Sequence, residues 1–206
     1  MKKALYIFLA ALIVAITALL LQLPTNGQEQ SDQRIETFSQ SFQELDALNQ
    51  RVLGEVSESF PNHSLESWVN EQKTFWEKER TAILVYDKGQ LAAWNTSDVP
   101  VRFHLDDRSK VMEGAIRLKN GLYLARTSSF ENELSVVCLT LIRHEYPIHN
   151  RYLTDNWHPA LLGTDGLNLY LYEQDGSSGI EVGGEPVLYA SATISDSYSY
   201  QWSASL

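Results

Sequence analysis

The centre of the chain reads Ile116-Arg-Leu-Lys-Asn-Gly-Leu-Tyr-Leu-Ala-Arg-Thr127 and, after a break at 128–133, Leu134-Ser-Val-Val-Cys-Leu-Thr-Leu-Ile142. Asn120-Gly121 is a strong hairpin signal, because both turn residues must accept positive φ. The last run is apolar at nearly every position, which predicts a central strand covered on both faces. It continues into an aromatic and cationic exit segment, Arg143-His-Glu-Tyr-Pro-Ile-His-Asn-Arg-Tyr-Leu153.

Further strand patterns lie on both sides of this centre. Ala82-Ile-Leu-Val-Tyr86 and Gln90-Leu-Ala-Ala-Trp94 flank a turn that contains Gly89, which predicts a second hairpin. Leu167-Asn-Leu-Tyr-Leu-Tyr172 and Val187-Leu-Tyr-Ala190 predict two more strands. Helical patterns precede all of these strands, an order typical of α+β domains. We expect an antiparallel sheet of about five strands, with a long helix on one face and the exit segment on the other.

The N-terminus carries an apolar run, Ala4 to Leu21, behind Lys2 and Lys3. At about 1.5 Å per residue, this run just crosses a hydrocarbon core of roughly 30 Å. The following residues offer only a poor cleavage site, so we expect an uncleaved transmembrane signal anchor at 1–23; a cleaved signal peptide is the alternative. The lysines then stay in the cytoplasm, and the bulk of the chain lies outside the inner membrane, in the periplasm or its equivalent.

Residues 24–60 are predicted to form one long juxtamembrane helix, because apolar side chains recur with heptad spacing between Gln, Glu, Ser, Asp and Arg. Asn49 falls within this apolar stripe. In coiled coils an amide at such a position often fixes the register of the helices and limits their number to two. One interpretation is a homodimer seam between two copies of the helix. The other is that the stripe packs on the protein's own sheet. The predicted seam consists of Ile35, Phe38, Phe42, Leu45, Asn49, Val52 and Val56.

The charge of the chain limits its partners. Lys+Arg 16 against Asp+Glu 26 gives a formal net charge of −10, which argues against nucleic acid and against docking on an anionic lipid face. The single cysteine, Cys138, lies in the apolar run and is expected to be buried and inert. His144-Glu145 with His149 has the wrong spacing for a zinc site. We therefore expect no catalytic site, no metal site and no cofactor.

Aromatic and cationic side chains gather around the central strands. Several arginines close to aromatic rings in an acidic protein suit a carboxylate or another small anion. Arg117 and Tyr123 are expected to share one face, because each alternates with apolar neighbours. The alternative is that the arginines pair on the surface with Glu131, Glu133 or Glu145. The candidate ligand residues are Trp94, Arg117, Tyr123, Arg126, Arg143, Tyr146, Asn150 and Tyr152.

Several short motifs carry a family resemblance through their order in the chain. They are the Lys2-Lys3 anchor, the heptad helix, Ile83-Leu-Val-Tyr86 with Leu91-Ala-Ala-Trp94, Leu118-Lys-Asn-Gly-Leu-Tyr-Leu124 and Tyr146-Pro-Ile-His-Asn-Arg-Tyr-Leu153. Over residues 1 to about 160 the chain resembles the extracytoplasmic N-terminal region of membrane-bound sensor histidine kinases of the kind common in Bacteroidota. Sensor domains of the PAS and Cache type share the expected architecture, so the resemblance implies such a sensor domain at 61–206.

The resemblance implies an input domain that senses an external cue and passes it through the membrane in a two-component system. The chain shows no phosphoacceptor-histidine helix and no ATP-binding motif, so the domain itself is expected to be non-catalytic. We expect a second membrane span or a partner subunit to supply the output. The rival interpretation is a stand-alone membrane-anchored binding or adhesion protein.

Overall fold

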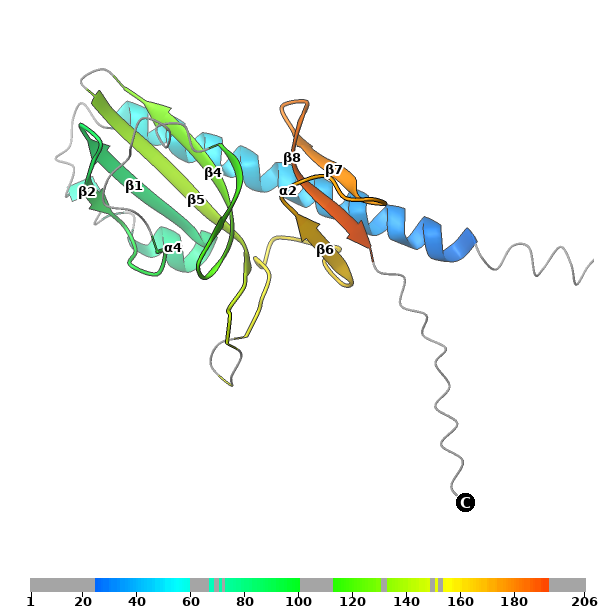
Figure 1. Ribbon diagram of the computed structural model, residues 1–206. Helices are drawn as coiled ribbons and strands as arrows, with labels where there is room; N and C mark the ends of the chain where they lie inside the picture. Colours follow the sequence, from blue (N-terminus) through cyan, green and yellow to red (C-terminus); the bar gives the residue numbers. More distant parts are fainter. Residues whose placement is uncertain are drawn as a thin grey trace, which may run out of the picture.

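The chain is built from one long helix, a short helix and two antiparallel sheets (Figure 1). The computed structural model describes residues 25–59, 67–68, 71, 73–100, 113–130, 133–148, 151 and 154–192. Its helices are α2 (Thr25–Ser59) and α4 (Lys73–Glu79). Its strands are β1 (Thr81–Asp87), β2 (Gln90–Trp94), β3 (Gly114–Leu118), β4 (Gly121–Ser129), β5 (Leu134–His144), β6 (Leu167–Tyr170), β7 (Ser178–Val182) and β8 (Glu185–Ala192). The predicted α+β class, with a long helix and an antiparallel sheet, is confirmed.

The strands form two separate sheets. The first has five strands in the order β2-β1-β5-β4-β3, and every neighbouring pair is antiparallel. The second has three strands in the order β6-β8-β7, also antiparallel. The expected sheet of about five strands is therefore present. The strands after residue 166 build a second sheet and do not extend the first.

β5 is the centre of the first sheet, between β1 and β4. Residues 136–142 are all buried, as the apolar run predicts. Their side chains alternate between two faces of the sheet. Leu139 shares a buried cluster with Trp76 of α4, whereas Cys138 on the other face shares one with Val52 of α2. Each face of β5 thus has its own helix, which is why the run contains so few polar residues.

Both predicted hairpins are present, but their turns differ from expectation. In the β1–β2 turn, Lys88 and Gly89 have positive φ, 51° and 77°. In the β3–β4 turn, neither Asn120 nor Gly121 has positive φ. Gly121 is needed for space, because a Cβ there would lie 2.6 Å from the carbonyl oxygen of Arg143. The Asn-Gly pair thus predicts the hairpin correctly and its backbone conformation wrongly.

α2 covers both sheets with one apolar stripe. Phe42 belongs to a buried cluster that includes Leu124 of the first sheet and Leu188 of the second. Val52, further along α2, belongs to a cluster with Ile83 of the first sheet. Figure 1 shows the N-terminal half of α2 beside β7 and β8 and its C-terminal half behind the first sheet. One helix therefore supplies the shared core of the two sheets.

This packing corrects the predicted dimer seam, because the stripe faces the chain's own sheets and not a second copy. The buried members are Phe38, Phe42, Leu45, Asn49, Val52 and Val56, and Ile35 packs against the same core. The alternative interpretation, packing on the protein's own sheet, describes the structure. The opposite face of α2 exposes Glu29, Asp32, Glu36, Glu44 and Glu55. Pairing two copies through that face would bring like charges together, and a homodimer stays a prediction.

The buried amide of Asn49 holds α2 on the first sheet. Thr140 donates its hydroxyl hydrogen to Asn49 Oδ1, and Asn49 Nδ2 donates to the carbonyl oxygen of Leu124 at 3.4 Å. The Thr140 hydroxyl also lies 2.6 Å from the hydroxyl of Thr81. Both hydrogen bonds of Asn49 are therefore made to the first sheet.

The predicted helix at 24–60 corresponds to α2. The predicted membrane anchor at 4–21 lies outside the described residues. Among the residues that are described, no helix is both long enough and apolar enough to span a bilayer. The exit segment also differs from expectation. Arg143 at its start lies over the ring of Trp157, which packs edge-on against Phe38 of α2. The segment therefore begins on the α2 side of the sheet and not on the opposite side.

The segment at 154–166 leads from the first sheet to the second, and buried His158 ties it to α4. The ring Nε2 lies 3.0 Å from the carbonyl oxygen of Glu79, and the amide of Ala160 donates to Nδ1 at 3.1 Å. Since Nδ1 accepts, the proton is on Nε2 and the ring is neutral. Burial lowers the pKa of His158 below its ordinary value of 6.5.

Replacing Asn49 by Leu should destabilise the fold by about 1–3 kcal/mol, because the Leu124 carbonyl then loses its buried donor. The oligomeric state should not change. Urea unfolding gives the free energy and sedimentation gives the mass. Gln43→Leu, which also replaces a side-chain amide by Leu but at an exposed position of α2, is the control and should cost little. A more stable Asn49→Leu variant with a different oligomeric state would restore the dimer seam.

The neutral ring of His158 predicts a pH dependence of stability. The pKa of His158 is lowered in the folded state. Below pH 6.5 the imidazole therefore binds a proton in the unfolded chain and stays neutral in the folded chain. The contribution of neutral His158 to the free energy of unfolding is complete above pH 6.5. It is lost as the pH falls, by up to roughly 1.4 kcal/mol per pH unit. Urea unfolding from pH 7.5 to 5 should show a shallower pH slope for His158→Gln than for the wild type. His144→Gln is the matched control; an unchanged slope in His158→Gln contradicts the assignment.

Candidate functional site

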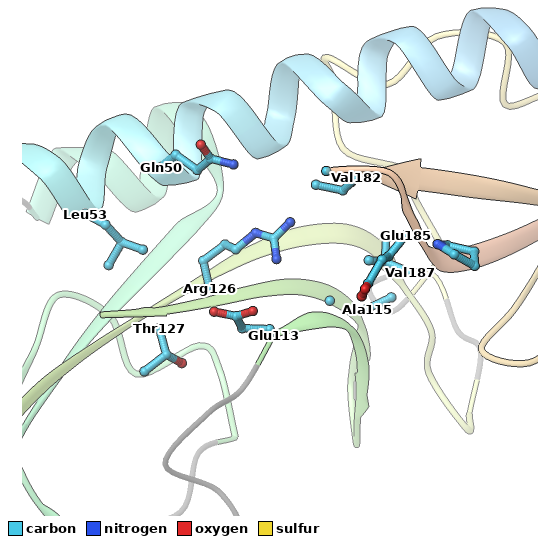
Figure 2. Close-up of a pocket in the computed structure, with 12 residues that line it drawn as sticks. Gln50, Leu53, Glu113, Ala115, Arg126, Thr127, Val182, Glu185 and Val187 are labelled. Atoms are coloured by element: carbon cyan, nitrogen blue, oxygen red, sulfur yellow. The ribbon is translucent and has the colours of Figure 1, made fainter. Parts of the chain in front are cut away.

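A cavity of about 650 Å³ lies where α2 and the two sheets meet (Figure 2). A volume of this size is typical of small-molecule sites. Three separate parts of the fold supply its walls. α2 contributes Gln50 and Leu53, the β3–β4 hairpin contributes Ala115 and Arg126, and the β7–β8 hairpin contributes Val182 and Val187. No single sequence segment could have revealed the cavity, because its walls come from three parts of the chain.

Glycines with positive φ shape the backbone where the two sheets meet at the cavity. Gly114, at the start of β3, has φ +87°, and a Cβ there would lie 3.5 Å from two side-chain atoms of Val187 in β8. The β7–β8 turn consists of Gly183 and Gly184, with φ of 65° and 86°. A two-residue turn with positive φ at both positions matches the twist of the flanking strands. The turn therefore brings the second sheet close to the edge of the first.

One of the lining residues, Arg126, belongs to a mostly buried ion pair. Arg126 Nε lies 2.5 Å from Asp46 Oδ1, and the two side chains are 13% and 5% exposed. The other Asp46 oxygen accepts a hydrogen bond from Gln50 Nε2 at 2.7 Å. Asp46 belongs to α2 and Arg126 to β4, so this pair is the second polar contact that holds the helix on the first sheet. It also neutralises most of the charge that Arg126 brings to the cavity.

Two carboxylates lie at the rim. Glu113 and Glu185 line the cavity and are exposed, and within the described part of the chain neither has an ion pair. Figure 2 shows the Glu113 carboxylate below the side chain of Arg126 and the Glu185 carboxylate beside Ala115. With the Arg126–Asp46 pair counted as neutral, the described lining carries an excess of negative charge. This balance disagrees with the small anion expected from the sequence, which stays untested.

The predicted ligand residues do not come together as one site. Arg117 pairs with Leu122 across the β3–β4 ladder, and Ile116 pairs with Tyr123. Directly opposed residues share a face of the sheet, so Arg117 and Tyr123 lie on opposite faces, contrary to the expectation. Arg117 instead forms an exposed ion pair with Glu145, at 2.8 Å. That contact is the surface pairing proposed as the alternative.

Tyr123 and Tyr146 lie near each other at the end of the first sheet. The Tyr123 hydroxyl donates to Asn120 Oδ1 at 3.1 Å, and burial raises the pKa of Tyr123 to about 12. Tyr146 stacks on His144 with ring centroids 5.3 Å apart. Its hydroxyl lies 3.2 Å from His144 Nδ1. These contacts give the hydroxyl groups of Tyr123 and Tyr146 hydrogen-bond partners within the fold. Tyr123 therefore has a structural role.

The remaining candidates are scattered. Arg143 lies 5.0 Å from the ring centre of Trp157 and 3.4 Å from Asp155, and its buried Nε has no hydrogen-bond partner in the described structure. Trp94 is half-exposed in a separate groove beside α4. Asn150 and Tyr152 lie outside the described residues. Among the predicted residues that the structure describes, only Arg126 lines the large cavity.

Cys138 is buried as predicted, and burial raises the pKa of its thiol to about 12. A thiol with such a pKa carries almost no thiolate at neutral pH, so it is a poor nucleophile. Groups of three or more His, Cys, Asp or Glu that could hold a metal ion do not occur in the described ranges.

Breaking the buried ion pair should cost more than breaking the exposed one. Arg126→Met should lower the free energy of unfolding by about 3 kcal/mol or more, because Asp46 is left buried and unpaired. Adding Asp46→Asn should recover part of the loss. Arg117→Met, which breaks the exposed pair with Glu145, is the matched control and should cost at most about 1 kcal/mol. Urea unfolding of the four proteins measures this; equal losses for the two single arginine variants would contradict the assigned burial.

Comparisons with protein-family models, with curated protein sequences and with solved structures found no match for this chain. The candidate site is therefore defined by its own geometry. It is a cavity between a helix and two sheets, lined by Arg126 of a buried ion pair and by two exposed carboxylates.

Proposed function

We propose that this chain is an extracytoplasmic ligand-sensing input domain of a membrane signalling protein, and that the cavity at the sheet junction is its ligand site. The observation that carries the proposal is the composition of the cavity wall. α2, the first sheet and the second sheet each contribute to it. A ligand in this position contacts all three parts at once, so it favours whichever arrangement of the three fits it best.

We further propose that the first sheet is a PAS or Cache core. The order β2-β1-β5-β4-β3, with every pair antiparallel, supports this because it is the strand order of PAS-type sheets. The long helix before the first strand and the smaller second sheet after the fifth support a Cache-like arrangement of two units along one helix. This fold-level likeness bears on the architecture only, since one fold hosts many functions.

α2 is the proposed path of the signal. It follows the predicted anchor directly in the chain, so a displacement of its N-terminal half would reach the membrane. Two buried polar contacts hold α2 on the first sheet, through Asp46 and Asn49. Toward the second sheet α2 makes apolar contacts, and Arg34 donates to the carbonyl oxygen of Asp165 at 3.1 Å. Movement of the second sheet along α2 therefore breaks fewer directional bonds than movement of the first.

Gly163 supports this division of roles. A Cβ there would lie 2.8 Å from the carbonyl oxygen of Arg34 and 3.2 Å from Thr37, and its φ is +71°. The segment before β6 therefore lies directly on the backbone of α2. In the proposed mechanism, this close contact transmits displacement of the second sheet to the N-terminal turns of the helix.

The rival function, a stand-alone binding or adhesion protein, would use the same cavity without moving α2. Pulsed electron paramagnetic resonance on the full chain in lipid nanodiscs separates the two. One label pair joins Gln90 of β2 to Asp175 before β7, and another joins Gln90 to Gln33 of α2; all three positions are exposed. Cys138 is buried and stays unlabelled.

A compound found by thermal-shift screening of small metabolites should change at least one of these two distances by several ångströms. The distance from Gln90 to Lys119 in the β3–β4 turn is the control. It should stay constant, because both positions belong to the first sheet. Tight binding with all three distances unchanged would contradict the sensing function and favour the stand-alone binding protein.

A further inference from the structure

We infer that the cavity at the sheet junction takes a small aliphatic amine, bound through its ammonium group. The inference rests on the proposed function for its choice of site. It goes beyond that function by naming the chemical class of ligand. Three features of the cavity carry it: the charge that remains after internal pairing, the nature of the walls, and the types of side chain that the lining contains.

The charge favours a cation. Arg126 is engaged by Asp46 at 2.5 Å in a pair that is mostly buried. Among the described lining residues Glu113 and Glu185 remain, and Figure 2 shows the Glu185 carboxylate beside Ala115 and the Glu113 carboxylate below the side chain of Arg126. An anion entering this space would meet two like charges, and it would have to compete with Asp46 for the guanidinium. An ammonium group brings three hydrogen-bond donors and the opposite charge.

The walls favour an aliphatic body. Leu53 comes from α2, and Val182 and Val187 come from the second sheet. These side chains offer apolar surface to methylene groups, while the carboxylates lie at the open rim. A ligand with a short hydrocarbon chain therefore buries apolar area at the walls and keeps its charged end near Glu113 and Glu185.

The absence of aromatic rings from the described lining narrows the class of ligand further. The described lining of this cavity contains no Phe, Tyr or Trp. Quaternary ammonium ligands are recognised mainly by aromatic cages, through cation–π attraction. A primary amine instead needs hydrogen-bond acceptors, and the two glutamates supply them. The formal net charge of −10 adds a long-range field that raises the local concentration of cations.

Three four-carbon probes of matched length test the inference on the full chain in a non-ionic detergent. Isothermal titration calorimetry should rank 1,4-diaminobutane above 4-aminobutanoate and 4-aminobutanoate above butanedioate, because the probes differ mainly in their terminal charges. Butanedioate binding most tightly would overturn the inference and restore the anion expected from the sequence. Failure of the diamine to bind would overturn it as well.

Two variants locate the binding. Glu113→Gln and Glu185→Gln should each weaken diamine binding about fivefold, the scale of a partly exposed charge pair. Glu181→Gln, an exposed glutamate of β7 that does not line the cavity, is the matched control and should leave the affinity unchanged. Equal affinities in all four proteins would place the amine elsewhere and overturn the assignment. The thermal midpoint of each variant shows whether it is folded.

The outcome is separable from that of the proposed function. Diamine binding at the two glutamates without movement of the Gln90–Gln33 or Gln90–Asp175 distances would contradict sensing and leave the ligand class standing. Movement caused by a compound without an amine, together with no diamine binding, would contradict the ligand class and leave sensing standing.

Discussion

The fold depends on one constraint: a single helix has to cover the apolar faces of two sheets. The apolar stripe of α2 meets this constraint. Phe38 and Phe42 pack at the junction of the two sheets, and Val52 and Val56 pack on the first sheet. Apolar contacts of this kind give stability but tolerate sliding along the helix axis. The buried contacts of Asp46 and Asn49 with the first sheet remove that freedom, because only one axial position satisfies both.

The cavity follows from the same constraint. α2 is straight in outline while the two sheets are separate, so the three cannot close completely where they meet (Figure 1). Gly114 gives the start of β3 its positive φ, and the Gly183-Gly184 turn brings the second hairpin to the rim. The remaining space is lined by whichever side chains the three parts place there. The site is thus a product of the arrangement of elements, and no local motif encodes it.

Predictions from the sequence were correct where only one structure explains a pattern. They were wrong where two different structures explain it equally well. The apolar run of β5 requires cover on both faces, and the structure provides it. A heptad stripe, by contrast, fits a partner helix or the chain's own sheet equally well, and Asn49 is compatible with both. The assignment of faces failed for Arg117 and Tyr123 because it needs the register of the β3–β4 ladder. β7 was missed because Ser178 and Gly179 are typical of turns.

The candidate ligand chemistry shows why charged residues are hard to interpret without their partners. Arg126 predicts an anion site when it is considered alone, but Asp46, 80 residues earlier, already pairs with it. What a ligand meets is the charge left over, which comes from Glu113 and Glu185. The pair has a second consequence, because Asp46 belongs to α2 and Arg126 to β4. In the proposed site, a ligand cation at the rim repels the guanidinium of Arg126, and it therefore acts on the contact that sets the position of α2. The proposal thus couples ligand charge and helix position through one ion pair.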